Sequence, residues 1–70
     1  MKKEKRLVCL IRDFREDRGM TQEELSRASG VNRVCISRYE TGAAVPSFDT
    51  AGKIAAVFNV TVDELFEKVG

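Results

Sequence analysis

The stretch MTQEELSRASGVNRVCISRYETG, residues 20–42, decides the fold of this 70-residue chain. Thr21 is its second residue, and Glu24 follows three residues later, which is the reciprocal capping box that starts an α-helix. A second N-cap residue, Asn32, comes shortly after Gly30, and a glycine lets the chain reverse tightly between two helices. The stretch therefore predicts two short helices joined by a tight turn, the layout of a helix-turn-helix.

Similar signals predict further helices on both sides of this stretch. Apolar residues recur at three- and four-residue steps from Leu7 to Phe14, and Gly19 follows as a helix stop. Ser47 is an N-cap residue, and a second capping box stands at Thr61 and Glu64. Sustained period-two alternation, the mark of strands, is missing from the sequence. We therefore expect an all-α fold in one domain spanning residues 1–70, with five helices at about 4–18, 21–29, 32–40, 47–58 and 61–68.

Composition argues against an enzyme. The chain contains no histidine, which is the commonest general base and the commonest metal ligand. Cys9 and Cys35 lie far apart without a CxxC pattern, which does not fit a structural zinc site. Reduced, packed thiols are the favoured interpretation, while a disulfide and a thiol switch at Cys35 stay open. We expect no catalytic residues, no metal, no cofactor and no small-molecule ligand.

The apolar stretches are far shorter than the ~20 residues that cross a bilayer, and the charged start leads into no secretory segment. A cytoplasmic protein without a membrane partner is expected. The net charge of +1 hides a gradient of +3 in residues 1–18, 0 in residues 19–46 and −2 in residues 47–70. A chain with a basic front and an acidic back can approach a polyanion in one orientation.

The 32–40 helix carries the residues that suggest a function. Winding it at about 100° per residue places Ile36 and Tyr39 on one side and Val34 and Arg38 on the other. Arginine offers a bidentate fork to guanine, and an aliphatic side chain can pack on a thymine methyl. An ordinary solvated surface helix is the alternative, because arginine is common on helix surfaces.

Five ordered blocks of this sequence together resemble the Cro and phage-repressor type of helix-turn-helix, the Xre family. The blocks are Gly19–Leu25, Ala28–Asn32, Ile36–Gly42, Pro46-Ser47 with Lys53–Ala55 and Phe58–Val60, and Asp63–Phe66. The resemblance implies a compact, five-helix, lambda-repressor-like domain. It also implies sequence-specific binding of double-stranded DNA by a small transcriptional regulator, with a repressor favoured, that reads the major groove with its third helix.

The resemblance also implies roles for single residues. Relatives contact base edges from the first exposed positions of the third helix and from a position about one and a half turns later, which are here Arg33, Val34, Ser37 and Arg38. Contacts to the DNA backbone are expected from Thr21, Gln22, Asn32 and Thr41. Arg15 and Glu40 match a structural ion pair that docks the first helix against the third.

Two departures from the family pattern stand out. Ala43, Ala44 and Val45 occupy the loop in which many relatives place Lys or Arg against phosphate. Non-specific binding should therefore be weaker than is usual in the family unless Lys2, Lys3, Lys5 or Arg6 compensates. Ala51 and Gly52 stand where relatives often have leucines. Phe48 is expected to supply the missing bulk on the apolar face that it shares with Ala51, Ile54, Ala55 and Phe58. A partner that packs there is the alternative.

A homodimer on a pseudo-palindromic operator is expected, because one small module buries too little surface to single out an operator. The predicted dimer interface comprises the apolar residues Val57, Val60, Val62 and Phe66, with Val69 beyond them. Completion of the monomer core is the alternative role for these side chains. The alternative function is a protein-binding module of the antitoxin type that neutralises a partner protein.

Overall fold

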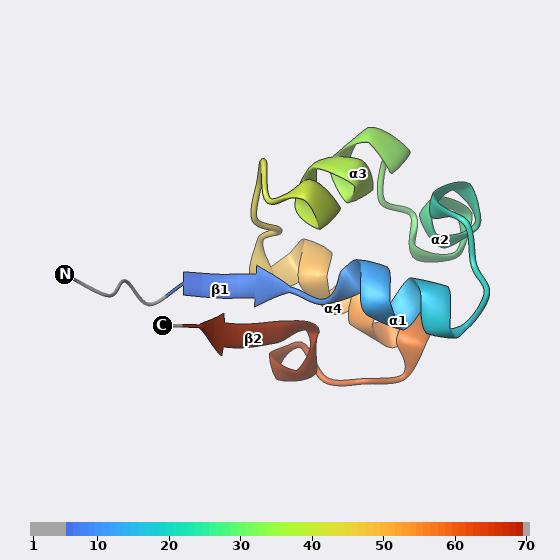
Figure 1. Ribbon diagram of the computed structural model, residues 1–70. Helices are drawn as coiled ribbons and strands as arrows, with labels where there is room; N and C mark the ends of the chain where they lie inside the picture. Colours follow the sequence, from blue (N-terminus) through green and yellow to red (C-terminus); the bar gives the residue numbers. More distant parts are fainter. Residues whose placement is uncertain (1–5, 70) are drawn as a thin grey trace, which may run out of the picture.

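Residues 6–69 fold into four α-helices flanked by two terminal strands (Figure 1). The structure, a computed structural model, describes the backbone of these residues and the side chains of residues 9–66. The elements are β1 (Arg6–Cys9), α1 (Ile11–Asp17), α2 (Gln22–Ser29), α3 (Arg33–Thr41), α4 (Phe48–Phe58), the 3₁₀ turn η1 (Asp63–Leu65) and β2 (Phe66–Val69). β1 and β2 pair antiparallel and extend away from the helices.

The three central helices begin where their capping residues predict. Thr21 Oγ1 accepts a hydrogen bond from the Glu24 amide at 3.0 Å, and Glu24 Oε1 accepts one from the Thr21 amide at 2.8 Å, which completes the capping box. Asn32 caps α3 by accepting from the Val34 amide at 2.7 Å, and Ser47 caps α4 by accepting from the Thr50 amide at 3.2 Å. The predicted second, third and fourth helices are therefore confirmed.

The predicted first helix, 4–18, is wrong in its start. α1 begins only at Ile11, and the described residues before it form the strand β1. Leu10 precedes the helix without a side-chain cap, and residues 1–10 contain no Ser, Thr, Asp or Asn that could cap an earlier start. Leu7, Val8 and Cys9 also form a continuous apolar run, which fits a short strand as well as it fits one face of a helix.

The predicted fifth helix, 61–68, is also wrong, and with it the five-helix count. Its capping box does form, because Thr61 and Glu64 exchange hydrogen bonds of 2.7 and 3.2 Å. The helix nevertheless stops after the single turn η1, since Phe66 is extended and pairs with Cys9. Pairing with β1 satisfies backbone groups that a fifth helix would otherwise have bonded internally.

The helices enclose a small apolar core. Its fully buried large side chains are Ile11, Leu25, Ile36, Ile54, Phe58 and Leu65. Ala51 and Ala55 complete the buried face of α4, but Phe48 is 77% exposed and supplies none of the bulk expected of it. Phe48 is the first residue of α4, and it lies outside the core. No helix within residues 6–69 is long and apolar enough to cross a membrane.

Candidate functional site

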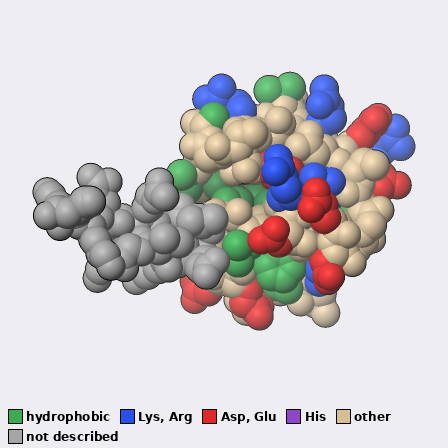
Figure 2. Space-filling view, in the orientation of Figure 1, with side chains coloured by type: hydrophobic (Ala, Val, Ile, Leu, Met, Phe, Trp, Pro, Cys, Tyr) green, Lys and Arg blue, Asp and Glu red, His purple; other side chains and the backbone are tan. Residues whose placement is uncertain are grey.

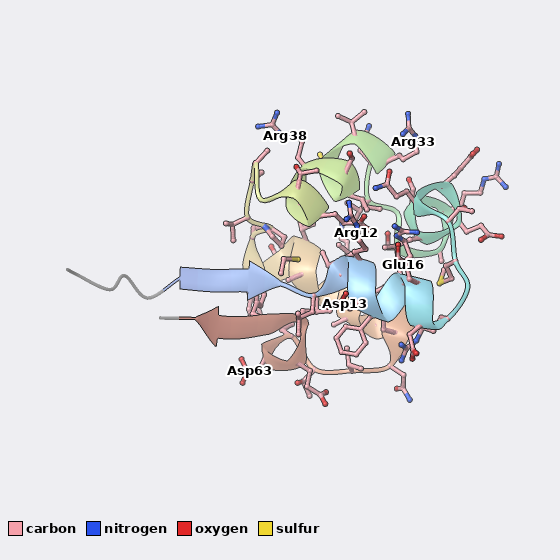
Figure 3. All side chains as sticks on the ribbon, viewed as in Figure 1. Arg12, Asp13, Glu16, Arg33, Arg38 and Asp63 are labelled. Atoms are coloured by element: carbon pink, nitrogen blue, oxygen red, sulfur yellow. The ribbon has the colours of Figure 1, made fainter. Side chains whose placement is uncertain are left out.

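The outward face of α3 carries the candidate base-reading residues. Arg33, Val34 and Arg38 are exposed and Ser37 is half-buried, while Ile36 on the opposite side is fully buried. Figure 3 shows Arg33 and Arg38 projecting from opposite ends of α3, away from the other helices. The structure thus brings these four residues to one exposed face. An Arg fork at each end, with an aliphatic side chain between, can address base edges in a groove.

Among the described residues, the edge over α3 and the opposite edge differ in charge (Figure 2). Figure 2 shows basic side chains along the edge that lies over α3, whereas the opposite edge is mostly acidic. Asp13 and Asp63 lie towards the acidic side in Figure 3, and Arg33 and Arg38 lie on the basic side. This difference comes from how the described side chains are placed, because Arg33 and Arg38 lie in the segment 19–46, whose net charge is 0. The α3 face is therefore the side that suits a polyanion.

The turn between α2 and α3 holds the two helices at a fixed angle. Gly30 adopts φ of 78°, the left-handed conformation that favours glycine, and its amide bonds to the Ser26 carbonyl at 2.8 Å. The Ser26 hydroxyl donates to the Val31 carbonyl, and the Val31 amide donates to Ser29 Oγ at 3.1 Å. Val31 itself is buried in the core. These hydrogen bonds and the buried Val31 therefore hold α3 in one orientation relative to α2.

The carboxylate of Glu40, near the end of α3, joins three helices. Its side chain is 0% exposed. Arg15 of α1 donates from Nε to Oε2 at 2.8 Å and from Nη2 to Oε1 at 3.1 Å, so the expected ion pair is present and bidentate. Gln22 of α2 donates from Nε2 to Oε1 at 3.0 Å, and Arg12 of α1 donates from Nε to the same oxygen at 3.4 Å.

These contacts set the protonation of the pair. Burial alone would raise the pKa of Glu40, but the hydrogen bonds from Arg15 and Gln22 and the charge of Arg15 outweigh it and lower the pKa below its ordinary value of 4.5. The hydrogen bonds to Glu40 likewise raise the pKa of Arg15. Arg15 Nη1 also donates to the Met20 carbonyl at 2.7 Å, which ties the loop before α2 to the same cluster. Both groups are therefore charged at neutral pH.

The residues expected to face the DNA backbone surround the α3 face. Thr21, Asn32 and Thr41 are exposed, and the first two already use their side chains as helix caps. Gln22 is half-buried and bonded to Glu40, a contact that the sequence did not indicate. One hydrogen bond uses one of the two N–H groups on Nε2, so the amide retains capacity for a second acceptor.

The loop between α3 and α4 is apolar. Ala43 and Val45 are exposed, Ala44 is half-buried, and Thr41 Oγ1 donates back to the Arg38 carbonyl at 3.2 Å. Val45 and Phe48 are among the exposed large hydrophobic side chains of the described residues. The compensating residues Lys2, Lys3 and Lys5, and the side chain of Arg6, lie outside the part that the structure describes.

The predicted dimer residues contribute partly to the monomer. Val57, Val60, Val62 and Phe66 are half-buried and pack against the core. Each keeps some exposed surface that a second copy could cover. The side chain of Val69 lies outside the described residues.

The two cysteines are free, and both are half-buried. Burial raises the pKa of Cys9, which disfavours its reactive thiolate. Cys35 lies in α3 between the buried and exposed faces. Among the described residues, no group of three potential ligands is placed to hold a metal ion. The thiol switch at Cys35 stays a prediction.

Sequence reasoning missed one more cationic contact. The guanidinium carbon of Arg18 lies 5.3 Å from the Phe14 ring centroid and 5.2 Å from that of Phe58, and Nη2 donates to the Phe58 carbonyl at 2.9 Å. Phe14 lies 4 residues from Arg18 and Phe58 lies 40 residues from it. Helical spacing could have predicted the contact with Phe14 but not the contact with Phe58. Arg18 therefore links the end of α1 to the end of α4.

Known proteins resemble this chain in sequence and structure. The profile of the family HTH_3, described as helix-turn-helix, matches residues 11–65. An uncharacterised HTH-type transcriptional regulator of Archaeoglobus fulgidus is 50% identical over 56 residues, which cover 80% of each chain. The cryptic phage CTXphi transcriptional repressor RstR of Vibrio cholerae is 36% identical over 55 residues, which cover 79% of this chain and 50% of RstR.

A solved structure has a similar fold. The crystal structure of SinR, a master regulator for biofilm formation, in complex with DNA aligns with a TM-score of 0.75 and 30% sequence identity. The alignment covers 79% of this chain and 89% of the SinR chain.

Proposed function

This chain belongs to the helix-turn-helix family HTH_3, and from that membership we propose that it is a DNA-binding transcriptional regulator that reads the major groove with α3. The exposed face of α3, with Arg33 and Arg38 at its two ends, is the observation that carries the proposal. The SinR structure supports it, because that relative was solved with DNA bound.

The roles of the residues on the α3 face follow from their chemistry. Arg33 and Arg38 donate forked hydrogen bonds to guanine O6 and N7, Val34 packs on a thymine methyl, and Ser37 donates to or accepts from either kind of base pair. Contacts from Thr21, Gln22, Asn32 and Thr41 to phosphate fix the register of α3 on the duplex but carry no sequence information.

The regulator acts as a repressor and binds its operator as a homodimer. RstR, a relative, is named a transcriptional repressor. Two copies related by a two-fold axis would read a pseudo-palindromic site, which increases specificity over that of one module. The C-terminal residues Val57, Val60, Val62 and Phe66 form the interface in this proposal.

Residues 1–70 act as a single non-enzymatic domain in the cytoplasm under this proposal. The alternative, an antitoxin-type module that neutralises a partner protein, gains no support from the relatives described above, which are named for transcriptional regulation or repression.

Selection of bound duplexes from a random pool tests the proposal, because it reports binding, half-site sequence and symmetry together. Replacing Arg33 or Arg38 by alanine should then cost about 1–3 kcal/mol on the selected site and relax the preference at one base pair, since one bidentate contact is lost. Binding to scrambled duplex should change little. Affinities of both variants for both duplexes, measured by fluorescence anisotropy, provide the check.

Gln22→Ala is the matched control, because a lost phosphate contact weakens binding to all sequences alike. If Arg33→Ala and Arg38→Ala lowered the affinity for selected and scrambled duplexes by one common factor, base reading by α3 would be refuted. Failure of the parent to enrich any duplex would refute DNA binding itself.

A further inference from the structure

In many relatives the loop that corresponds to Ala43–Val45 supplies cations that contact phosphate, whereas this chain has no cation in that loop. Among the described residues, Arg12 of α1 meets the requirements of a replacement. Its side chain is 52% exposed, whereas that of its neighbour Arg15 is 12% exposed. Figure 3 places Arg12 on α1 on the side towards α3, next to Glu16.

Arg12 and Gln22 converge on one atom. Arg12 Nε and Gln22 Nε2 donate to the same oxygen, Glu40 Oε1, at 3.4 and 3.0 Å. The two donors come from different helices, α1 and α2, yet a single small anion in front of them could reach both. Gln22 is the residue already expected to contact phosphate, so Arg12 brings a charge to that contact.

Arg12 is the least committed of the donors around Glu40. The carboxylate has about four lone-pair sites, and Arg15 and Gln22 occupy three of them with bonds of 2.8, 3.1 and 3.0 Å. Two of these bonds, from Arg15 Nη2 and Gln22, already use both lone-pair sites of Oε1. Arg12 is a third donor to that same oxygen, with its Nε alone and at the longest distance, 3.4 Å. A guanidinium has five N–H groups, so those on Nη1 and Nη2 are left to donate elsewhere.

The local charge also favours an anion. Two guanidinium groups, Arg12 and Arg15, surround the one buried carboxylate of Glu40. Glu16 contributes a further carboxylate, but it is largely exposed, and its contact is with Arg15 Nη2 at 3.9 Å. Exposed charges interact weakly because water and salt screen them. The 3.4 Å contact with Glu40, a carboxylate that Arg15 also shares, is therefore the ion pair that offsets the Arg12 charge among the described residues.

We propose that Arg12 and Gln22 form a clamp for one phosphate of the DNA backbone, with the buried Glu40 holding both donors in place. The inference rests on the proposed DNA-binding function and adds to it a cation from α1. The clamp recognises phosphate only, so it supplies affinity on every sequence and no base preference. It takes the place of the cations absent from the loop at Ala43–Val45.

The salt dependence of binding tests the clamp. Neutralising one phosphate changes the slope of log K against log salt by about 0.9, so Arg12→Gln should lower the magnitude of the slope by about that amount. The expectation holds equally for selected and scrambled duplexes. Arg12→Lys, which keeps the charge, should retain most of the parent slope. Titrations at several salt concentrations, with melting curves of each variant, give the measurement.

Arg27→Gln is the matched control. It removes the same charge from an arginine that is 76% exposed and pairs with Glu23 on the outside of α2. A slope unchanged in Arg27→Gln and reduced in Arg12→Gln supports the clamp. If Arg12→Gln and Arg27→Gln gave equal slopes, the clamp would be refuted although DNA binding would stand. The same holds if the slope of Arg12→Lys were as low as that of Arg12→Gln. A parent that binds no duplex would overturn both proposals.

Discussion

Glu40 is the residue on which the arrangement of the helices depends most. Its carboxylate is fully buried and accepts hydrogen bonds from Arg12, Arg15 and Gln22. A buried charge is tolerated only with such partners, because desolvation without them costs several kcal/mol per ion. Loss of this carboxylate therefore affects the packing of α1, α2 and α3 together.

Replacing Glu40 by alanine should lower the free energy of unfolding by about 3–5 kcal/mol at neutral pH, because Arg15 is left mostly buried without its partner. The lowered pKa of Glu40 gives this loss a pH dependence. The folded state holds the carboxylate charged more strongly than the unfolded state does. The stabilisation is therefore complete above about pH 4.5 and disappears as the pH falls through the lower pKa of the folded protein. Urea unfolding at a series of pH values from about 3 to about 7 provides the check. The difference in free energy of unfolding between the parent and Glu40→Ala should become smaller as the pH falls.

Glu23→Ala provides the comparison, since the Glu23–Arg27 pair has a similar length of 2.9 Å but is exposed. An exposed pair contributes about 0–1 kcal/mol, so this variant should unfold almost like the parent. Equal losses in Glu23→Ala and Glu40→Ala would contradict a special role for the buried pair.

At this scale the sequence predicted part of the site. The exposed positions on α3 follow from helical spacing and from the family resemblance, and the pair of Arg15 and Glu40 follows from the resemblance alone. The contacts of Arg12 and Gln22 with Glu40 span 28 and 18 residues, and they depend on how three helices dock. Local periodicity contains no information about such docking, so the convergence of donors needed the structure.

At the scale of elements, capping residues were better predictors than hydrophobic periodicity. The helices with a side-chain cap at Thr21, Asn32 and Ser47 start where predicted. The helix predicted from periodicity alone, 4–18, begins only at Ile11, and residues 6–9 form β1 instead. Short apolar runs fit a helix and a strand equally well. The capped turn at Thr61 was overridden by pairing of β2 with β1, a contact between opposite ends of the chain.

Two glycines should respond in opposite ways to alanine. Gly52 lies inside α4, and a methyl group added there would meet nothing within 4 Å. Gly52→Ala should stabilise the protein by roughly 0.5–1 kcal/mol, because alanine loses less backbone entropy in a helix. Gly30 also has open space, but its φ of 78° is unfavourable for a side chain. Gly30→Ala should therefore destabilise the protein by about 1–2 kcal/mol.

Melting temperatures of the two variants provide the measurement. Because neither methyl group would clash, opposite signs would isolate the backbone conformation as the cause. If both variants shifted the melting temperature in one direction, that explanation would fail.

At the scale of the whole molecule, the predicted dimer requires that the C-terminal region has apolar surface left exposed in the monomer. Phe66 is half-buried and packs against the core, so only part of its surface is available to a second copy. We expect the parent to sediment as a dimer at micromolar concentration and Phe66→Ala to sediment as a monomer, because truncating a central aromatic anchor weakens an interface most.

Phe48→Ala separates this interface from the other exposed apolar surface, since Phe48 is a large exposed side chain outside the predicted contact. It should leave the dimer intact. Dissociation in Phe48→Ala with a stable dimer in Phe66→Ala would instead place the interface at the start of α4. Melting curves show whether Phe66→Ala is still folded.

The pairing of β1 with β2 leaves residues 6 and 69 directly opposite each other across the ladder, at the end of a molecule 42 Å long. A short peptide could therefore join them without disturbing the helices, and new ends could be opened in the exposed α3–α4 loop instead. Such a circular permutant would keep every side-chain contact around Glu40, and it would start and stop beside the face assigned to DNA. A protein fused to the new ends of the permutant would lie beside the DNA duplex. A protein fused to the parent beyond residue 6 or 69 would instead lie at the end of the paired strands.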